Sequence, residues 1–233
     1  MKKITIITTF YNQNDFLKKV VSDWISWSDE VRDQFSFCIL DDYSKTIATE
    51  VLKDIDLSNL DISIYRVTDD IPWNQHGATN LGIQECSTDY VMVIDMDTVV
   101  SENLAVELLK LANLNVENVA YRFNRMRKSG RVHKIHPKVC LINKKEFWEV
   151  GGYDEDFCGN YGHNDRWFWY RWEYHNKQVE DKSDLYLNMR NEFGRAPNMV
   201  RCTKHNTHLL KSKQKRKDVF PKDFIRFGWK KLL

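Results

Sequence analysis

The first half of the chain alternates between short runs of β-branched and apolar residues and segments whose apolar residues recur at helical spacing. Such runs predict buried strands, and the helical periodicity between them predicts connecting helices. The expected strands are 3–9, 35–40, 62–67 and 90–94, and the expected helices are 16–25, 47–52, 75–86 and 101–111. Strands separated by helices favour a mainly parallel sheet with right-handed crossovers. We therefore expect an α/β domain in which helices flank a mainly parallel central sheet.

The second half of the chain is less regular. We expect strands at 119–123, 139–143 and 185–189, a basic loop at 124–138, a short helix at 146–150 and a longer helix that begins at Asn164. Asn12 or Asn14 is the expected cap of the first helix, and Ser101 that of the helix after the fourth strand. Short polar side chains accept backbone hydrogen bonds at such positions.

The charge and cysteine distributions limit the possible partners. The net charge of +2 combines a +7 tail at residues 211–233 with a body of −5. An acidic body argues against a nucleic-acid-binding protein, which needs basic residues along a groove. The five cysteines form no C-x-x-C pair, so we expect neither a disulfide framework nor a zinc knuckle. No run approaches the ~18 apolar residues of a membrane helix, and the N-terminal apolar run is too brief for a signal peptide. We expect a cytoplasmic protein.

Polar clusters follow three of the predicted strands, at Thr9–Asn12, Asp41–Ser44 and Asp95–Thr98. In open α/β sheets, ligands bind beyond the carboxyl ends of the strands. The three clusters therefore indicate one binding site. No G-x-G-x-x-G element follows the first strand, so a dinucleotide cofactor is not expected.

Asp95 and Asp97 flank Met96 directly after the fourth predicted strand. Alternate residues of an extended segment point to one side, so both carboxylates can face one site. Two carboxylates suit a hard cation, Mn2+ or Mg2+, which shares its coordination shell with substrate phosphates. The structural alternative is an acidic turn after a strand.

Asp41 and Asp42 end the second predicted strand and precede Tyr43. A carboxylate here can accept a hydrogen bond from a nucleotide base or a ribose hydroxyl, with Tyr43 stacked on the ring. The alternative is a turn in which Asp41 binds nearby amides. The pattern alone leaves both readings open.

Five motifs occur in order: Thr9-Phe10-Tyr11-Asn12, Asp41-Asp42-x-Ser44, Asn74–Gly82, Asp95-x-Asp97 and Gly151-Gly152-Tyr153-Asp154-Glu155-Asp156-Phe157. Each is loose alone, but their order over residues 3–175 resembles a GT-A fold glycosyltransferase of the family 2 type. The resemblance implies a nucleotide-sugar donor, Mn2+ or Mg2+, and a glycan or lipid-linked acceptor. It also implies a catalytic domain at 1–210, with a nucleotide-binding half at 1–100 and an acceptor-binding half at 101–210. The basic aromatic tail, 211–233, follows.

The resemblance assigns roles to individual residues. Those implied to bind the nucleotide are Thr9, Tyr11, Asn12, Asp41, Asp42, Asn74, Asn80 and Asp95, and those implied to hold the metal are Asp95, Asp97 and His205. His205 is preferred to His208 as the histidine of the metal shell, and a surface position is the alternative for both. Many relatives carry an arginine before the asparagine of the N-x-G element, where this chain has Thr79. The expected substitute is Asn74, Gln75 or His76.

The basic loop at 124–138 has its own expectations. His133 and His136 are not expected to bind metal, whereas Lys134 or Lys138 can approach a phosphate. On the acceptor side, residues 159–165 stand where similar enzymes carry an acidic pair, and they resemble the W-G-G-E-D-D motif of galactosyltransferases. Asp165 is then implied as the general base, at a helix N-terminus whose dipole favours the carboxylate.

The alternative for Asn164 and Asp165 is that they only cap this helix. The residues expected to contact the acceptor are Tyr161, Asn164 and Trp73. Trp169 and Trp172, with Phe168, are expected in the core.

These expectations combine into metal-dependent, inverting transfer of a sugar, from a UDP-sugar by analogy, to an acceptor hydroxyl. One alternative is a sugar-nucleotide nucleotidyltransferase, which normally has a Gly-rich basic loop that Thr8–Asn14 lacks. Another is a non-catalytic carbohydrate-binding relative. The tail suits peripheral docking on an anionic membrane, or packing of its aromatic residues on the domain with the lysines in water.

Overall fold

The structure is a computed structural model that describes residues 3–133, 135–190, 199–220 and 223–233. Its strands are β1 (Ile4–Phe10), β2 (Phe35–Asp42), β3 (Ile62–Val67), β4 (Tyr90–Ile94), β5 (Thr98–Val99), β6 (Val119–Met126), β7 (Val132–His133), β8 (Cys140–Asn143), β9 (Gln178–Met189) and β10 (Trp229–Lys231). They form one mixed sheet in the order β10-β3-β2-β1-β4-β8-β6-β9-β5, with β7 paired to β6.

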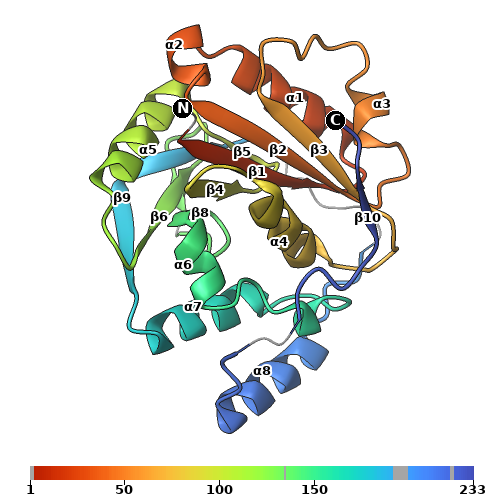
Figure 1. The fold of residues 1–233 in the computed structure, drawn as a ribbon, viewed down its shortest axis with the longest axis vertical. Coiled ribbons are helices and arrows are strands. Elements are labelled where there is room, and N and C mark those ends of the chain that lie inside the picture. Colours follow the sequence, from red (N-terminus) through yellow and green to blue (C-terminus); the bar gives the residue numbers. More distant parts are fainter. Residues whose placement is uncertain (1–2, 134, 191–198, 221–222) are drawn as a thin grey trace.

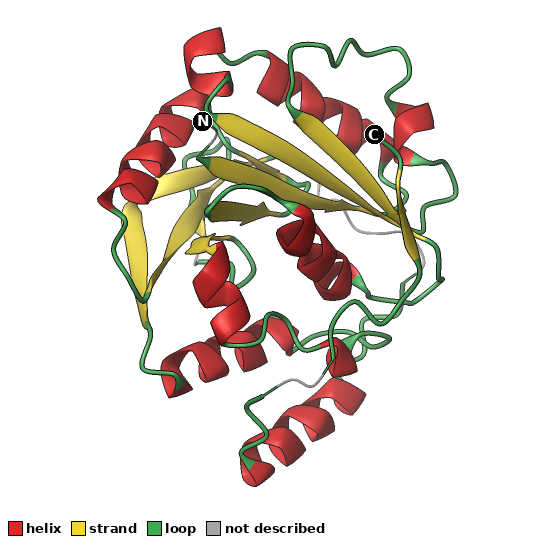
Figure 2. Ribbon diagram, viewed as in Figure 1, coloured by secondary structure: helices red, strands yellow, loops and turns green. Residues whose placement is uncertain are grey.

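The helices are α1 (Asn14–Ile25), α2 (Asp29–Arg32), α3 (Ala48–Val51), α4 (Gln75–Glu85), α5 (Glu102–Leu114), α6 (Lys144–Glu149), the 3-10 turn η1 (Glu155–Phe157), α7 (Asn164–Tyr174) and α8 (Lys204–Arg216). One apolar cluster joins α1, α3 and α5 to one face of the sheet, and a second joins α4, α6 and α7 to the other. The molecule therefore has three layers, with α8 at the periphery beside α7 (Figures 1 and 2).

The first four strands confirm the predicted parallel core. β1 pairs in parallel with both β2 and β4, and β2 pairs in parallel with β3. Every residue of β4 is buried, because helices cover the sheet on both faces. A strand in this position needs apolar side chains throughout, which explains its continuous apolar run. The other half is mixed, because β8 runs antiparallel to β4 and β6 whereas β9 runs parallel to β6. The carboxyl ends of β1, β2 and β4 therefore meet at one edge of the sheet.

Several elements differ from the expectations. The predicted basic loop at 124–138 contains the end of β6 and all of β7, which pair as a hairpin. The N-cap of α1 is Gln13, not Asn12 or Asn14, whereas Ser101 caps α5 as expected by accepting from the Leu104 amide. Trp169, Trp172 and Phe168 are buried as predicted.

The C-terminal segment packs on the body of the domain. The expected boundary at residue 211 falls inside α8, and β10 adds an antiparallel edge to β3. The Phe224 ring contacts Trp148 at 5.0 Å between centroids, and Phe227 is buried in the cluster that contains α4. Phe224 and Phe227 thus pack on the domain, whereas Phe220 and Trp229 are exposed. No helix of the described residues is long and apolar enough to cross a bilayer.

Candidate active site

A cavity of about 410 Å³ opens at the carboxyl ends of β1, β2 and β4. The residues of the expected site that line it are Thr9, Tyr11, Asp42, Trp73, Asp95, Asp97 and Tyr161. The three polar clusters thus converge because parallel neighbouring strands end at the same edge of the sheet.

Asp95 is held by two basic groups from the segment before β8. Its Oδ1 lies 3.1 Å from the Lys138 ammonium and its Oδ2 lies 3.3 Å from Nδ1 of His136. Burial alone raises the pKa of Asp95, but the charges of Lys138 and His136 outweigh burial and hold that pKa well below its usual range. Lys138 is itself buried and also donates to the Thr9 hydroxyl at 3.2 Å. Asp95 is therefore a fixed carboxylate. Lys134, the other expected lysine, lies outside the described residues.

Asp97 has a different environment. Its Oδ1 is buried and has no hydrogen-bond partner among the described residues. Burial, followed by the negative charge of Asp95, raises the pKa of Asp97 above its ordinary value. A buried oxygen without a donor beside a second carboxylate fits a hard divalent cation, which takes such oxygens as ligands. The described residues contain no group of three His, Cys, Asp or Glu side chains arranged for a metal, so a cation here needs oxygens from a ligand as well.

Asp42 lines the cavity, whereas Asp41 is not among the described lining residues. Burial raises the pKa of Asp42 to about 7, opposed by a hydrogen bond from Asn74 and reinforced by the charge of Asp41. Asp41 is fully buried, and its oxygens accept from the Ser44 and Ala48 amides and from the Arg66 guanidinium at 2.7–3.0 Å. Asp41 thus has the turn-forming role that the sequence offered as the alternative.

Other expected nucleotide or acceptor residues are also occupied by internal contacts. Asn12 accepts from the Lys45 amide at 2.7 Å, Asn80 donates to Glu155 and the Tyr153 carbonyl, and Asn164 bridges the backbone of Asp154. None of these three asparagines lines the cavity within the described ranges. Each one makes hydrogen bonds to a loop near the site.

The expected metal histidine is not at the cavity. His205 lies exposed in the first turn of α8, as does His208 one turn later, and the described part of the cavity wall includes neither. Among the described residues, the histidines that line it are His133 and His136, which are not expected to bind metal. Thr79, in place of the usual arginine, is buried and donates to the Gln75 carbonyl, while Gln75 itself reaches the cavity.

Asp165 lies in the first turn of α7 and contacts the first turn of α4. Its Oδ1 is 2.7 Å from Nε2 of His76, and its side chain is 18% exposed. Burial raises the pKa of Asp165, but His76, His136 and Lys138 outweigh burial and lower it. His136 and Lys138 thus act on both Asp95 and Asp165, although Asp165 is not among the described lining residues. Asp165 is a carboxylate kept ionised beside the cavity.

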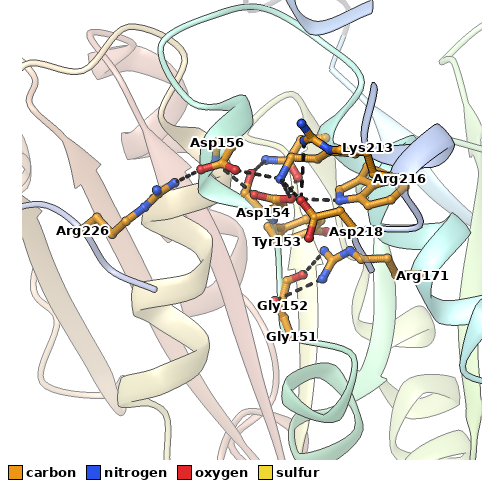
Figure 3. Close-up of polar contacts among 12 residues, drawn as sticks. Gly151, Gly152, Tyr153, Asp154, Asp156, Arg171, Lys213, Arg216, Asp218 and Arg226 are labelled. Atoms are coloured by element: carbon orange, nitrogen blue, oxygen red, sulfur yellow. Dashed lines mark hydrogen bonds and ion pairs between the residues drawn. The ribbon is translucent and has the colours of Figure 1, made fainter. Parts of the chain in front are cut away.

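The start of α7 is fixed by a polar network that begins after α6 (Figure 3). Asp154 accepts from the Trp167 indole at 2.9 Å and from Lys213 of α8 at 2.9 Å. The buried Arg171 donates to the carbonyls of Val150 and Gly152. These contacts connect Gly151–Asp156 to α8 and to α7, the helix whose first turn carries Asp165.

Two expected acceptor residues, Trp73 and Tyr161, touch at the rim of the cavity. Their ring centroids are 4.6 Å apart, and the Arg201 guanidinium lies 5.9 Å from one ring and 5.6 Å from the other. The Trp73 indole also donates to the Val200 carbonyl at 3.0 Å. At the rim, the loop after β3, which carries Trp73, and the loop before α7, which carries Tyr161, thus contact the segment before α8.

Two basic residues that line the cavity, Arg125 and Arg201, have no expected role in the sequence. Arg125, His133, His136 and Arg201 all reach the cavity. The sequence of β6 contains a partial indication for Arg125. Residues 123 and 125 lie on the same face of the strand, and a charged residue in line with the buried Phe123 suggests that this face leaves the core at residue 125. The role of Arg201 depends on a loop approach that no local pattern encodes.

Comparisons with known proteins agree with this architecture. The model of glycosyl transferase family 2 matches residues 5–208. The fold resembles that of residues 1–349 of TarS from S. aureus in complex with UDP-GlcNAc, with TM-score 0.71, 9% identity, and 89% of this chain and 64% of that chain covered. It also resembles the mannosyltransferase PcManGT from Pyrobaculum calidifontis in complex with GDP-Man and Mn2+, with TM-score 0.65, 12% identity, and 95% and 65% covered.

At these identities the likeness concerns the fold, and it confirms the expected GT-A architecture. The chain spans slightly less than two thirds of the length of either structure. No curated protein matches the sequence.

Proposed function

Because the chain belongs to glycosyl transferase family 2, we propose that it transfers a sugar from a nucleoside diphosphate to a hydroxyl of a glycan or lipid-linked acceptor. The observation that carries this proposal is the shared cavity of Thr9, Tyr11, Asp42, Asp95 and Asp97. It combines a nucleotide-sized space with the carboxyl groups of Asp42, Asp95 and Asp97, and Asp165 stands beside it. The complexes of TarS with UDP-GlcNAc and of PcManGT with GDP-Man support a nucleotide-sugar donor, and we propose a UDP-sugar.

Asp97, with Asp95 beside it, is the proposed holder of Mn2+ or Mg2+. The unpartnered, buried Oδ1 of Asp97 supports this assignment, and PcManGT is a fold neighbour with Mn2+. A bound divalent cation supplies positive charge to the diphosphate, where negative charge grows as the bond to the sugar breaks. The described residues bring no histidine of α8 to the cavity, so His205 is no longer part of the proposed shell.

The proposed reaction is a direct displacement at the anomeric carbon. The acceptor oxygen forms a bond to that carbon while the bond to the diphosphate oxygen breaks, which inverts the configuration. Asp165 takes the hydroxyl proton, and the nucleoside diphosphate leaves. The lowered pKa of Asp165 keeps it ionised at neutral pH, which is the form that can accept a proton. Trp73 and Tyr161 at the rim are the proposed contacts for the acceptor.

Product analysis tests the proposal against its alternatives. Purified protein with Mn2+ and a panel of nucleotide sugars and glycan acceptors is expected to release a nucleoside diphosphate and a glycosylated product. Asp165→Asn is expected to lower the rate by ~10²–10⁴ while donor binding persists, whereas the surface variant His208→Gln keeps the wild-type rate. Release of pyrophosphate indicates a nucleotidyltransferase instead. Donor binding without turnover, under conditions that saturate the protein, indicates a non-catalytic relative.

A further inference from the structure

Arg125 and His133 stand opposite each other in the hairpin formed by β6 and β7. They are direct partners in the antiparallel register, and both line the cavity that holds Asp95 and Asp97. Directly opposite residues on antiparallel strands project to the same face, with Cβ atoms about 4.5–5.5 Å apart. The two side chains therefore form one paired group on the cavity wall.

Both side chains carry a buried nitrogen without a hydrogen-bond partner in the described part of the chain. These atoms are Nε of Arg125 and Nε2 of His133. An unsatisfied buried polar group is costly, and a guanidinium has only donors and stays charged at every physiological pH. The imidazole donates from Nε2 when that nitrogen carries the proton. The pair is thus a donor set that lacks an acceptor.

The neighbouring carboxylates do not supply that acceptor. Asp95 is engaged by Lys138 and His136, and the described residues give Arg125 no ion pair with either Asp95 or Asp97. The charge of Arg125 nevertheless acts on both carboxylates, which places it within electrostatic reach of the proposed metal position. An arginine that is close to acidic groups but unpaired is suited to an anion that arrives with the ligand, because its planar fork matches phosphate and carboxylate oxygens.

We propose that Arg125 and His133 form an oxyanion-binding subsite for the donor. The oxyanion is either the terminal phosphate of the leaving diphosphate or the carboxylate of an acidic donor sugar. This inference rests on the proposed function and extends it, because it assigns the donor contacts to a hairpin that the sequence motifs do not include.

Binding measurements separate the two sources. Isothermal titration in Mn2+ compares UMP, UDP, UDP-glucose and UDP-glucuronic acid, with GMP, GDP and GDP-mannose as the guanosine counterparts. The variants are Arg125→Gln and His133→Asn, and the control is Arg131→Gln, an exposed arginine of the same hairpin. Arg125→Gln is expected to weaken the affected ligand by about tenfold or more, the scale of one lost charge-assisted contact, and His133→Asn to weaken the same ligand less.

A loss for UDP or GDP with the monophosphates unchanged assigns the subsite to the diphosphate. A loss confined to UDP-glucuronic acid assigns it to a sugar carboxylate. The proposed subsite is contradicted if the wild type binds these nucleotides and both variants bind them as tightly as the wild type does. It is also contradicted if the variants lose as much affinity for the monophosphates as for the diphosphates. A wild-type protein that binds none of them contradicts the proposed function itself.

Thermal unfolding gives an independent readout. The buried Nε of Arg125 has no hydrogen-bond partner among the described residues, and replacing it removes the cost of that unsatisfied donor. Arg125→Gln is therefore expected to keep or raise the unfolding temperature of the ligand-free protein. A purely structural Arg125 gives the opposite result, a lower unfolding temperature together with equal losses for all nucleotides.

Discussion

Nε2 of His76 lies 2.7 Å from Oδ1 of Asp165, and the two residues come from the first turns of α4 and α7. The imidazole is buried and packs edge-on against Tyr153, with 4.7 Å between ring centroids. This contact connects the proposed base to α4, whose first residue, Gln75, lines the cavity. It also opposes burial in setting the pKa of Asp165.

Removing His76 is expected to shift the acid limb of the rate profile to higher pH. Burial raises the pKa of Asp165, and His76 is the first of the groups that lower it, followed by His136 and Lys138. In His76→Leu the opposing contribution is lost, so the base is protonated at a higher pH, by on the order of one unit. The measurement is the dependence of kcat/KM on pH from about 3 to 7, which includes the acid limb of a carboxyl group whose pKa is below its ordinary value.

Two further variants control for this result. His76→Gln can still donate a hydrogen bond to Asp165 and is expected to lie between wild type and His76→Leu. His208→Gln changes an exposed histidine of α8 and is expected to keep the wild-type profile. An unchanged acid limb in His76→Leu, with activity retained, contradicts the coupling between the two residues.

Nucleotide binding is expected to strengthen as pH rises from 6 to 8. Burial holds the pKa of Asp42 at about 7, so its carboxyl group ionises in this range. If the ionised form accepts the ribose or base hydrogen bond, UDP affinity increases by up to about tenfold between these pH values. Titration calorimetry at pH 6 and 8 measures this increase, and Asp42→Asn is expected to abolish the dependence. An equal increase in Asp42→Asn assigns the titration to another group.

Asp97→Asn is expected to stabilise the metal-free protein and to abolish its stabilisation by Mn2+ with UDP. Burial and the charge of Asp95 raise the pKa of Asp97, so the native state binds this proton more tightly than the unfolded state does. Its contribution to stability therefore decreases as pH rises through the native pKa, and an uncharged amide removes that loss. Ligands that bind only the native state raise the unfolding temperature.

The check is thermal unfolding with and without Mn2+ and UDP at pH 7.5. Wild type is expected to gain stability with the ligands, and Asp97→Asn to start higher and gain little. A full gain in the variant places the cation elsewhere.

The sequence predicted the parallel half of the fold because buried parallel strands carry continuous apolar runs that are recognisable locally. The positions of Asp42, Asp95 and Asp97 followed from this, since residues just after such strands must lie at one edge of the sheet. The internal hydrogen bonds of Asp41 and Asn80 could not be predicted in this way. Their partners, Arg66 and Glu155, are distant in sequence, and a motif letter does not distinguish an asparagine that binds a ligand from one that binds a loop.

The C-terminal part was the least predictable. The helix α8 is mostly polar, and β10 has only three residues, so neither carries a strong periodic signal. Both are defined by tertiary contacts, such as β10 against β3 and Lys213 against the loop after α6. The sequence pattern therefore could not predict that part of the segment after residue 211 contacts β3 and the loop after α6.

Lys213 is expected to be the residue of α8 that contributes most to stability. Its side chain is 5% exposed, and its ammonium lies 2.9 Å from Asp154 and 2.7 Å from Asp156. Removing one partner of a buried ion pair leaves an uncompensated charge, so Lys213→Met is expected to lower the free energy of unfolding by ~3–5 kcal/mol. Urea unfolding measures this loss, and Lys211→Met, which changes an exposed lysine of the same helix, is expected to lose far less.

Lys213→Met also tests whether the polar network around Asp154 positions Asp165. Asp154 accepts from Lys213 and from the Trp167 indole with the same oxygen, and Trp167 lies two residues after Asp165 on α7. Loss of Lys213 therefore removes one of the contacts that hold the start of α7, and kcat is expected to fall more than donor affinity does. Equal stability and equal kcat in Lys213→Met and Lys211→Met show that the network neither stabilises α8 nor positions the base.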